Sequence, residues 1–132
     1  IMQCMIIYKN NQILGSLEAD IMEVVWKLGN ASVRQVLGKL NRKRRVAYTT
    51  VMTVMARLYV KGILSRRFDE AGAYIYTPIQ DKITFLEHSS KKLIRNLISE
   101  FGEVAVAQFV DTVQRSSLKD LKKWRAMLRK IK

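Results

Sequence analysis

The residue types that most often perform catalysis or bind metal ions are scarce in this sequence. It holds one cysteine, Cys4, and one histidine, His88. A disulfide, a multi-cysteine metal site and a two-histidine metal site therefore lack their raw material. Ser89 and Ser90 follow His88, but no glycine-framed elbow surrounds them. We expect His88 to be a polar residue on a helix surface, and we expect no enzyme activity, no metal and no cofactor.

The chemistry that the sequence does concentrate is positive charge. Its 132 residues include 24 Lys and Arg against 11 Asp and Glu, a formal net charge of +13 at pH 7. Such a surface attracts polyanions, chiefly nucleic acid or an anionic membrane. Residues 24–68 contain no Asp or Glu, and this acid-free block carries the cations Lys27, Arg34, Lys39, Arg42, Lys43, Arg44, Arg45, Arg57, Lys61, Arg66 and Arg67.

One predicted helix inside the acid-free block has a face of hydroxyl groups and an arginine. It begins near Tyr48 or Thr49, where a threonine hydroxyl can cap it. At about 100° per residue, Thr49, Thr53, Ala56 and Arg57 point away from its apolar stripe. Small polar side chains on such a face can reach base edges in a major groove. The alternative is that these threonines only cover a solvated helix, and the neighbouring charge favours the first interpretation. The stripe consists of Val51, Val54, Met55 and Leu58.

The elements around this helix follow a recognisable order. Apolar spacing predicts a helix over 17–28 and a second over 33–40, which opens with a capping box at Ser32 and Gln35. Two strands, 63–68 and 73–77, flank the turn 69–72 and end at Pro78. Leu17, Ile21 and Trp26 are expected in the core. The fold class is therefore mainly α with a small β-hairpin: a winged helix-turn-helix, in which the third helix enters the major groove.

Three more amphipathic helices are predicted after residue 80, with Asp81 and Ser117 as caps. A unit of this size cannot bury their faces well alone, so a second copy of the chain is the favoured partner, although folding back onto the first domain is an alternative. We expect a winged-helix DNA-binding domain over 1–79, including an extra segment 1–13, and a helical dimerisation domain over 80–132. The residues expected in the dimer interface are Leu93, Leu97, Phe101, Phe109, Leu121, Trp124 and Leu128. For Trp124, a place in the core of a single chain is an alternative.

Several strings in the first half resemble the penicillinase repressor family of bacterial transcription factors, which also includes methicillin-resistance repressors. They are Leu14-Gly15-Ser16-Leu17-Glu18, Ser32-Val33-Arg34 and, most specifically, Ala47-Tyr48-Thr49-Thr50-Val51-Met52-Thr53. The resemblance is close from residue 14 to about residue 78. It implies a homodimeric repressor that binds double-stranded operator DNA at an inverted repeat, with half-sites related to TACA and TGTA.

The resemblance also implies roles for individual residues. Base reading would fall to the third helix, at Tyr48, Thr49, Thr50, Met52 and Thr53, although core packing is an alternative for Tyr48 and Met52. Phosphates would be neutralised by the cations around that helix, which give affinity and register without sequence choice. These cations are Arg42, Lys43, Arg44, Arg45, Arg57, Lys61, Arg66 and Arg67.

In the antibiotic-resistance branch of the family, a membrane metalloprotease sensor inactivates the repressor by cutting an Asn-Phe bond. The matching place here is Gln108-Phe109, so the asparagine is absent. The family also contains copper-responsive repressors, which bind the metal through a cysteine-rich tail. Residues 79–132 contain no cysteine, so we do not expect copper sensing by that route. The regulated gene, the operator and the inducer are not determined by the sequence.

Two other functions fit the charge. One is a basic RNA-binding or ribosome-associated protein, which would need exposed aromatic rings for base stacking. The other is a surface membrane binder that uses the basic helix around Lys119, Lys122 and Lys123. No apolar run reaches the roughly 18 residues that span a bilayer, and residues 1–8 lack the flanks of a signal peptide. We therefore expect a cytoplasmic protein with no membrane insertion.

Overall fold

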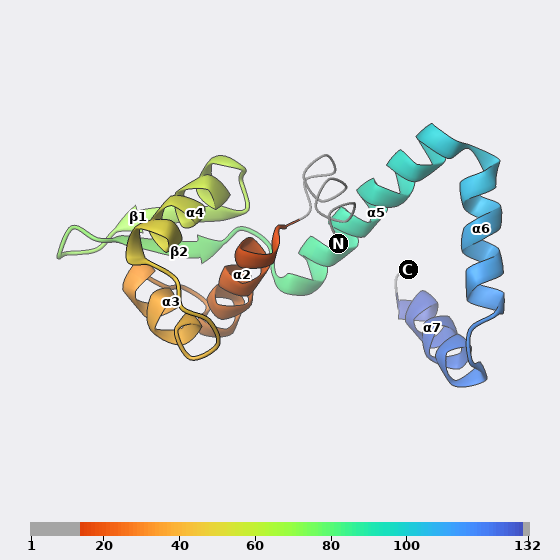
Figure 1. Ribbon diagram of the computed structural model, residues 1–132, viewed down its shortest axis with the longest axis horizontal. Helices are drawn as coiled ribbons and strands as arrows, with labels where there is room; N and C mark the ends of the chain where they lie inside the picture. Colours follow the sequence, from red (N-terminus) through yellow and green to blue (C-terminus); the bar gives the residue numbers. More distant parts are fainter. Residues whose placement is uncertain (1–13, 131–132) are drawn as a thin grey trace. The chain divides into compact units, whose positions relative to one another are not determined.

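The computed structural model describes residues 14–130, so the predicted N-terminal segment 1–13 lies outside the described residues. Within residues 14–130, three helices precede a hairpin and three follow it (Figure 1), which confirms the predicted class, a mainly helical fold with a winged helix-turn-helix. The elements are α2 (Ser16–Leu28), α3 (Val33–Leu40), α4 (Tyr48–Val60), β1 (Leu64–Phe68), β2 (Tyr74–Pro78), α5 (Lys82–Phe101), α6 (Glu103–Gln114) and α7 (Leu118–Lys130).

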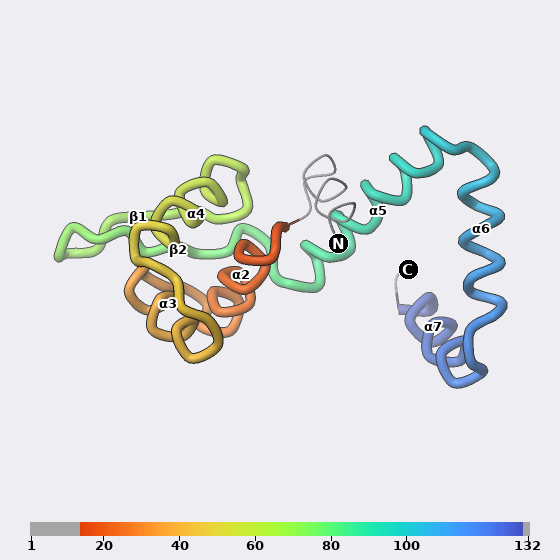
Figure 2. Tube along the Cα trace, viewed as in Figure 1, coloured from red at the N-terminus to blue at the C-terminus, as the bar shows by residue number. Residues whose placement is uncertain are grey.

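The chain divides into two compact units, one ending at Ser90 and one beginning at Lys91. The first contains α2, α3, α4 and the hairpin, whose traces lie against one another in Figure 2. The division falls inside α5, whereas the predicted domain boundary lies between residues 79 and 80. The assignment of a DNA-binding and a dimerisation domain to these regions stays a prediction.

The first unit has one apolar core, to which α3 and α4 contribute the stripes that the sequence predicts. The stripe of α2 differs in part: the sequence predicts that Leu28 belongs to it, but Leu28 is 41% exposed, and Met22, which is not part of the predicted stripe, is buried. Because apolar residues at helical spacing share one face, α2, α3 and α4 can each bury a row of side chains while the rest of the surface stays polar. The core includes Ile21, Met22 and Val25 of α2, Val33, Val36 and Leu40 of α3, Val51, Met55 and Leu58 of α4, and Leu64 and Tyr76 of the hairpin.

The start of α3 and the start of α4 differ in their capping. The predicted capping box is confirmed: the Ser32 N–H donates to Gln35 Oε1 at 2.9 Å, and the Gln35 N–H donates to Ser32 Oγ at 3.2 Å. The predicted threonine cap of α4 is wrong. The residue before this helix is Ala47, in an extended conformation and with no side-chain cap, so Thr49 already lies within the first turn.

The hairpin brings residues from both strands onto the core. Its register pairs Leu64 with Pro78 and Phe68 with Tyr74. Gly72 in the turn has φ of 81°, a backbone conformation that glycine adopts at little cost. Pro78 is the last residue of β2 rather than the residue after it. Ala31 adds an antiparallel bridge to Tyr76, through two N–H···O bonds of 2.9 Å. The sequence does not predict this bridge, because one isolated residue has no alternating pattern.

Trp26 lies at the edge of the core rather than at its centre. It is half-buried, its Nε1–H donates to the Gln80 carbonyl at 3.0 Å, and its ring centroid lies 5.4 Å from that of Phe85. These contacts connect α2 to the start of α5. Ile21 is fully buried and Leu17 is half-buried against the core, so all three predicted core residues do pack there.

The helices α5, α6 and α7 contain no buried residue. Asp81 caps α5, since its Oδ1 accepts the Thr84 N–H at 2.7 Å, and hydrogen bonding by the backbone of Thr84 is the main cause that lowers the pKa of the Asp81 carboxyl. Ser117 Oγ likewise accepts the Asp120 N–H at 3.2 Å. Both predicted caps are confirmed.

We expect Ser32→Ala to lower the free energy of unfolding by about 1 kcal/mol, because the first turn of α3 loses the acceptor for the Gln35 N–H. Urea denaturation followed by circular dichroism measures this change. Ser32→Asp is the matched control, since an aspartate can accept the same hydrogen bond and should retain the wild-type midpoint. Equal stabilities of the alanine and aspartate variants would contradict the role of the cap.

Candidate nucleic-acid interface

The face of α4 that lies opposite its buried stripe is open to solvent. Thr49, Thr50, Thr53 and Arg57 are all exposed. Tyr48 and Met52 are 44% and 43% exposed, so the alternative of core packing for these two side chains is wrong. All five residues predicted to read bases therefore lie on an accessible surface of one helix; base reading itself stays a prediction.

Thr53 has a defined hydrogen-bonding state on this face. Its hydroxyl donates to the Thr49 carbonyl at 2.8 Å, a bond to the preceding turn that threonines often make within helices. The hydroxyl proton is thereby occupied, while the oxygen lone pairs and the methyl group stay free. Thr53 can thus offer an acceptor to a base amino group or an apolar contact to a thymine methyl.

A groove of about 770 Å³ runs beside Tyr48 and Met52. Its other walls are the start of α3, over residues 32–35, and the hairpin turn with the first part of β2. Arg34 lines this groove and is exposed. Arg34 belongs to the acid-free block but not to the predicted phosphate contacts, because only the fold brings the start of α3 beside the start of α4.

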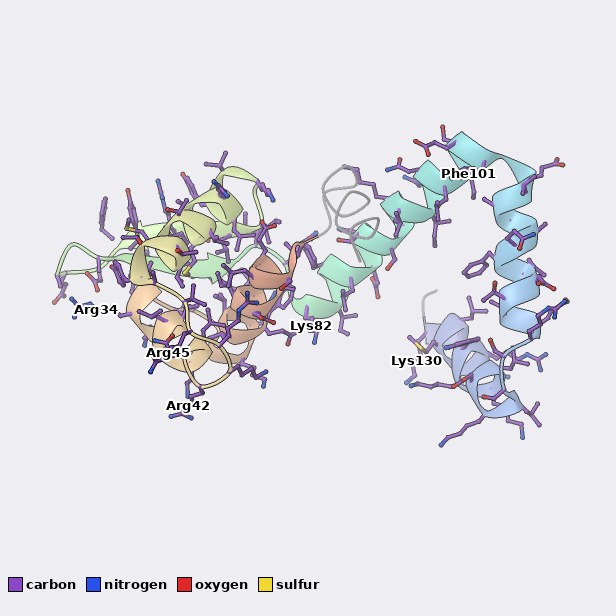
Figure 3. All side chains as sticks on the ribbon, viewed as in Figure 1. Arg34, Arg42, Arg45, Lys82, Phe101 and Lys130 are labelled. Carbon is purple, nitrogen blue, oxygen red and sulfur yellow. The ribbon has the colours of Figure 1, made fainter. Side chains whose placement is uncertain are left out.

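Five of the predicted phosphate contacts are exposed and have no ion pair within residues 14–130. Figure 3 shows Arg42 and Arg45 at the turn that follows α3, with Arg34 on α3 itself. Guanidinium and ammonium groups without an intramolecular ion pair can neutralise phosphates without first breaking a salt bridge. The five are Arg42, Lys43, Arg45, Arg57 and Arg67.

Arg44 and Lys61 instead pair with carboxylates of α2. These carboxylates precede the acid-free block. Arg44 Nη1 lies 3.0 Å from Asp20 Oδ2 and 3.2 Å from Ser16 Oγ. Lys61 Nζ lies 2.7 Å from Glu18 Oε2, and the second oxygen of Glu18 accepts the Gly15 N–H. Arg44 precedes α4 and Lys61 follows it, so these pairs connect both ends of α4 to the first turns of α2.

Arg66 is placed between aromatic rings. Its Cζ lies 4.0 Å from the ring centroid of Tyr59 on α4 and 4.0 Å from that of Tyr74 on β2. A side-chain hydrogen bond with Tyr76 is the largest of the causes that raise the pKa of Arg66 above its ordinary value. Arg66 is half-buried, whereas its neighbour Arg67 is exposed.

The second unit exposes its apolar side chains. Of the residues predicted for a dimer interface, Leu93 and Leu121 are half-buried and none is buried. The others keep large exposed fractions: Leu97 42%, Phe101 59%, Phe109 63%, Trp124 38% and Leu128 64%. Isolated exposed leucines are ordinary, but a run of them on three successive helices is not typical of a surface that faces only water.

The predicted cleavage bond, Gln108-Phe109, lies within α6. The Gln108 carbonyl accepts the Thr112 hydroxyl at 2.8 Å. A protease needs an extended substrate backbone, so cutting at this bond would require α6 to open locally.

Within the described part of the chain, no group of His, Cys, Asp and Glu side chains is placed to hold a metal ion. His88 is exposed and its Nδ1 lies 2.7 Å from Gln80 Nε2, in agreement with its predicted place on a helix surface. No helix over residues 14–130 is long and apolar enough to cross a membrane.

Known proteins resemble the chain over both units. The penicillinase repressor family matches residues 14–130. A transcriptional regulator BlaI of Mycobacterium tuberculosis is 33% identical over 79% of this chain and 67% of its own length. A penicillinase repressor of Bacillus licheniformis is 24% identical over 78% of this chain and 80% of its own length.

A solved structure shares the fold. The transcriptional regulator Tm0710 of Thermotoga maritima has a TM-score of 0.50 and 20% identity, covering 98% of this chain and 92% of its own. The family match spans all of the residues that the structure describes. This chain belongs to the penicillinase repressor family of winged-helix, DNA-binding transcriptional repressors.

Proposed function

We propose that this protein is a sequence-specific repressor that acts as a homodimer on an inverted-repeat operator. The observation that carries the proposal is the exposed face of α4, where three threonines and Arg57 lie among cations that have no ion pair within the described residues. Hydroxyl groups on a helix suit base edges, and the surrounding guanidinium groups suit phosphates. By occupying a promoter in the cytoplasm, the dimer would exclude the polymerase; no catalysis is part of this function.

Thr49, Thr50 and Thr53, with Tyr48 and Met52, would read bases. Arg42, Lys43, Arg45, Arg57 and Arg67 would neutralise phosphates, and Arg34 joins them because it lines the groove beside Tyr48. Arg44 and Lys61 can reach a phosphate only by leaving the carboxylates of α2, so we expect their contribution to be smaller.

The second unit would supply the dimer interface. Its helices carry large apolar side chains, and none of them is buried in a single chain. Pairing with a second copy removes such surface from water, at about 25 cal/mol per Å². A symmetric dimer then presents two copies of α4 to two half-sites, which explains why the operator would be an inverted repeat.

Release from the operator by a membrane metalloprotease sensor remains a prediction from the family. It would act on the Gln108-Phe109 region, and the exposed Phe109 ring supports recognition there. The helical state of this bond means that cleavage would depend on how readily α6 opens.

Fluorescence anisotropy tests DNA binding with three probes of equal length: a duplex with TACA and TGTA half-sites in inverted repeat, a scrambled duplex, and single-stranded RNA. We expect the inverted repeat to bind most tightly. If a dimer makes about 6 to 10 phosphate contacts, its affinity should fall by about 10³ to 10⁵ between 50 and 200 mM salt. Binding that ignores salt, or that prefers the RNA, would contradict the proposal, and the latter would favour the RNA-binding alternative.

We expect two changes at Thr53 to separate the ways in which it reads a base. Thr53→Val keeps a methyl group but removes the oxygen acceptor, while Thr53→Ser keeps the oxygen and removes the methyl. Whichever group contacts the base, its loss should reduce discrimination at one operator position by about 1 to 3 kcal/mol. Affinities for operators substituted one position at a time measure this effect. As a control, Arg45→Gln should weaken operator and scrambled duplex alike.

We expect Phe109→Glu and Leu128→Glu to convert a dimer into a monomer, because each places a charge on the apolar surface of the second unit. Sedimentation velocity at micromolar concentration measures the change. Val60→Glu is the control, since Val60 is 81% exposed on the first unit. We expect this variant to remain a dimer. A wild-type monomer under these conditions, or dimers in all three variants, would rule out this interface.

A further inference from the structure

Arg66 and Arg67 are adjacent arginines of β1, and both are predicted to contact phosphates. In a strand, neighbouring side chains point to opposite faces. Arg67 is exposed and has no hydrogen bond, ion pair or ring contact with any residue that the structure describes. Arg66 lies on the face that also carries the buried residues Leu64 and Tyr76. The two side chains therefore have the same charge and different surroundings.

The guanidinium of Arg66 bridges α4 and the hairpin. One ring above it is Tyr59, in the last turn of α4, and the other is Tyr74, the first residue of β2, with both centroids 4.0 Å from Arg66 Cζ. A planar cation over a ring face is attracted by the electrons of the ring. Tyr74 in turn stacks on Phe68, with centroids 4.2 Å apart and ring planes at 21°.

Neutralising a phosphate would cost Arg66 this arrangement. A bidentate contact with phosphate needs the edge of the guanidinium. A side-chain hydrogen bond with Tyr76, which is buried, already occupies part of that edge and directs it toward the core. Reaching a phosphate would therefore break this hydrogen bond and disturb the contacts with both tyrosine rings. Arg67 can reach a phosphate without breaking any such contact.

We propose that Arg66 is a positioning residue that holds the hairpin against the C-terminal end of α4, and that Arg67 makes the phosphate contact of the hairpin. This inference rests on the proposed DNA-binding function. It assigns to Tyr59, which contacts Arg66 from the helix side, a part in the same interaction. Through this contact the angle between hairpin and α4, and with it the width of the groove beside Tyr48, would be set before DNA binds.

The test compares Arg66→Met with Arg67→Met, which remove one charge each from neighbouring positions. Operator affinity is measured at several salt concentrations. We expect Arg67→Met to reduce the slope of log affinity against log salt by about 0.9 per hairpin that contacts DNA. Arg66→Met should leave the slope unchanged and lower affinity about 2- to 30-fold at every salt concentration, the range of one cation–π contact.

Arg66→Lys decides between charge and stacking. A lysine keeps the charge but lacks the planar group that fits between two rings. We expect it to behave like Arg66→Met. An Arg66→Lys variant with wild-type affinity, or an Arg66→Met variant with a reduced salt slope, would overturn the proposal and return Arg66 to the phosphate contacts.

A measurement without DNA separates this inference from the proposed function. In a double-mutant cycle on the free energy of unfolding in urea, Tyr59→Leu and Arg66→Met should couple, whereas Tyr59→Leu and Arg67→Met should be additive. If the wild type shows no operator preference, the proposed function fails while this cycle still tests the contact. If the operator is bound and the first pair is additive, the positioning role of Arg66 fails.

Discussion

Val51, Met55 and Leu58 of α4 have no solvent-exposed surface, and their burial sets the rotation of this helix about its own axis. Turning α4 to expose them would cost about 1.5 to 3 kcal/mol for each side chain. The opposite face is consequently fixed toward solvent, with its hydroxyl groups and Arg57. The chemistry of the surface thus depends on an apolar contact on the far side of the same helix, made with α2, α3 and the hairpin.

The electrostatics of the first unit divide its cations into two sets. The carboxylates Glu18 and Asp20 hold Lys61 and Arg44 at the two ends of α4, and tyrosine rings hold Arg66. Exposed ion pairs of this kind each contribute about 0 to 1 kcal/mol, so they orient α4 more than they stabilise the fold. The cations without such contacts are the ones that can meet an anion at no structural cost.

Much of the fold was predictable because its determinants are local. A helical stripe such as Ile21 and Val25 follows from a period of 3.6 residues, and the capping box at Ser32 involves groups three residues apart. The candidate site was predictable in outline for the same reason, since Thr49, Thr53 and Arg57 belong to one helix. The predicted threonine cap of α4 is wrong because the cap position is Ala47, which has no capping side chain, and Thr49 lies two residues after it.

The remainder of the site depends on contacts between residues that are distant in sequence. Arg44 and Asp20 are 24 positions apart, and Lys61 and Glu18 are 43 apart, so no spacing rule links them. Strand alternation could separate Arg66 from Arg67, but not reveal that Tyr59 lies within reach of Arg66. The bridge between Ala31 and Tyr76 is equally non-local. Such pairs decide which cations are free.

The edge position of Trp26 makes the two units spectroscopically distinguishable. The chain has two tryptophans: Trp26 packs on Phe85 and donates to the Gln80 carbonyl in the first unit, and Trp124 is 38% exposed in the second. A variant that retains only one of them would emit from a single unit. The emission wavelength of Trp26 would report a loosening of the contact between α2 and the start of α5. The emission wavelength of Trp124 would report the covering of α7 by another surface.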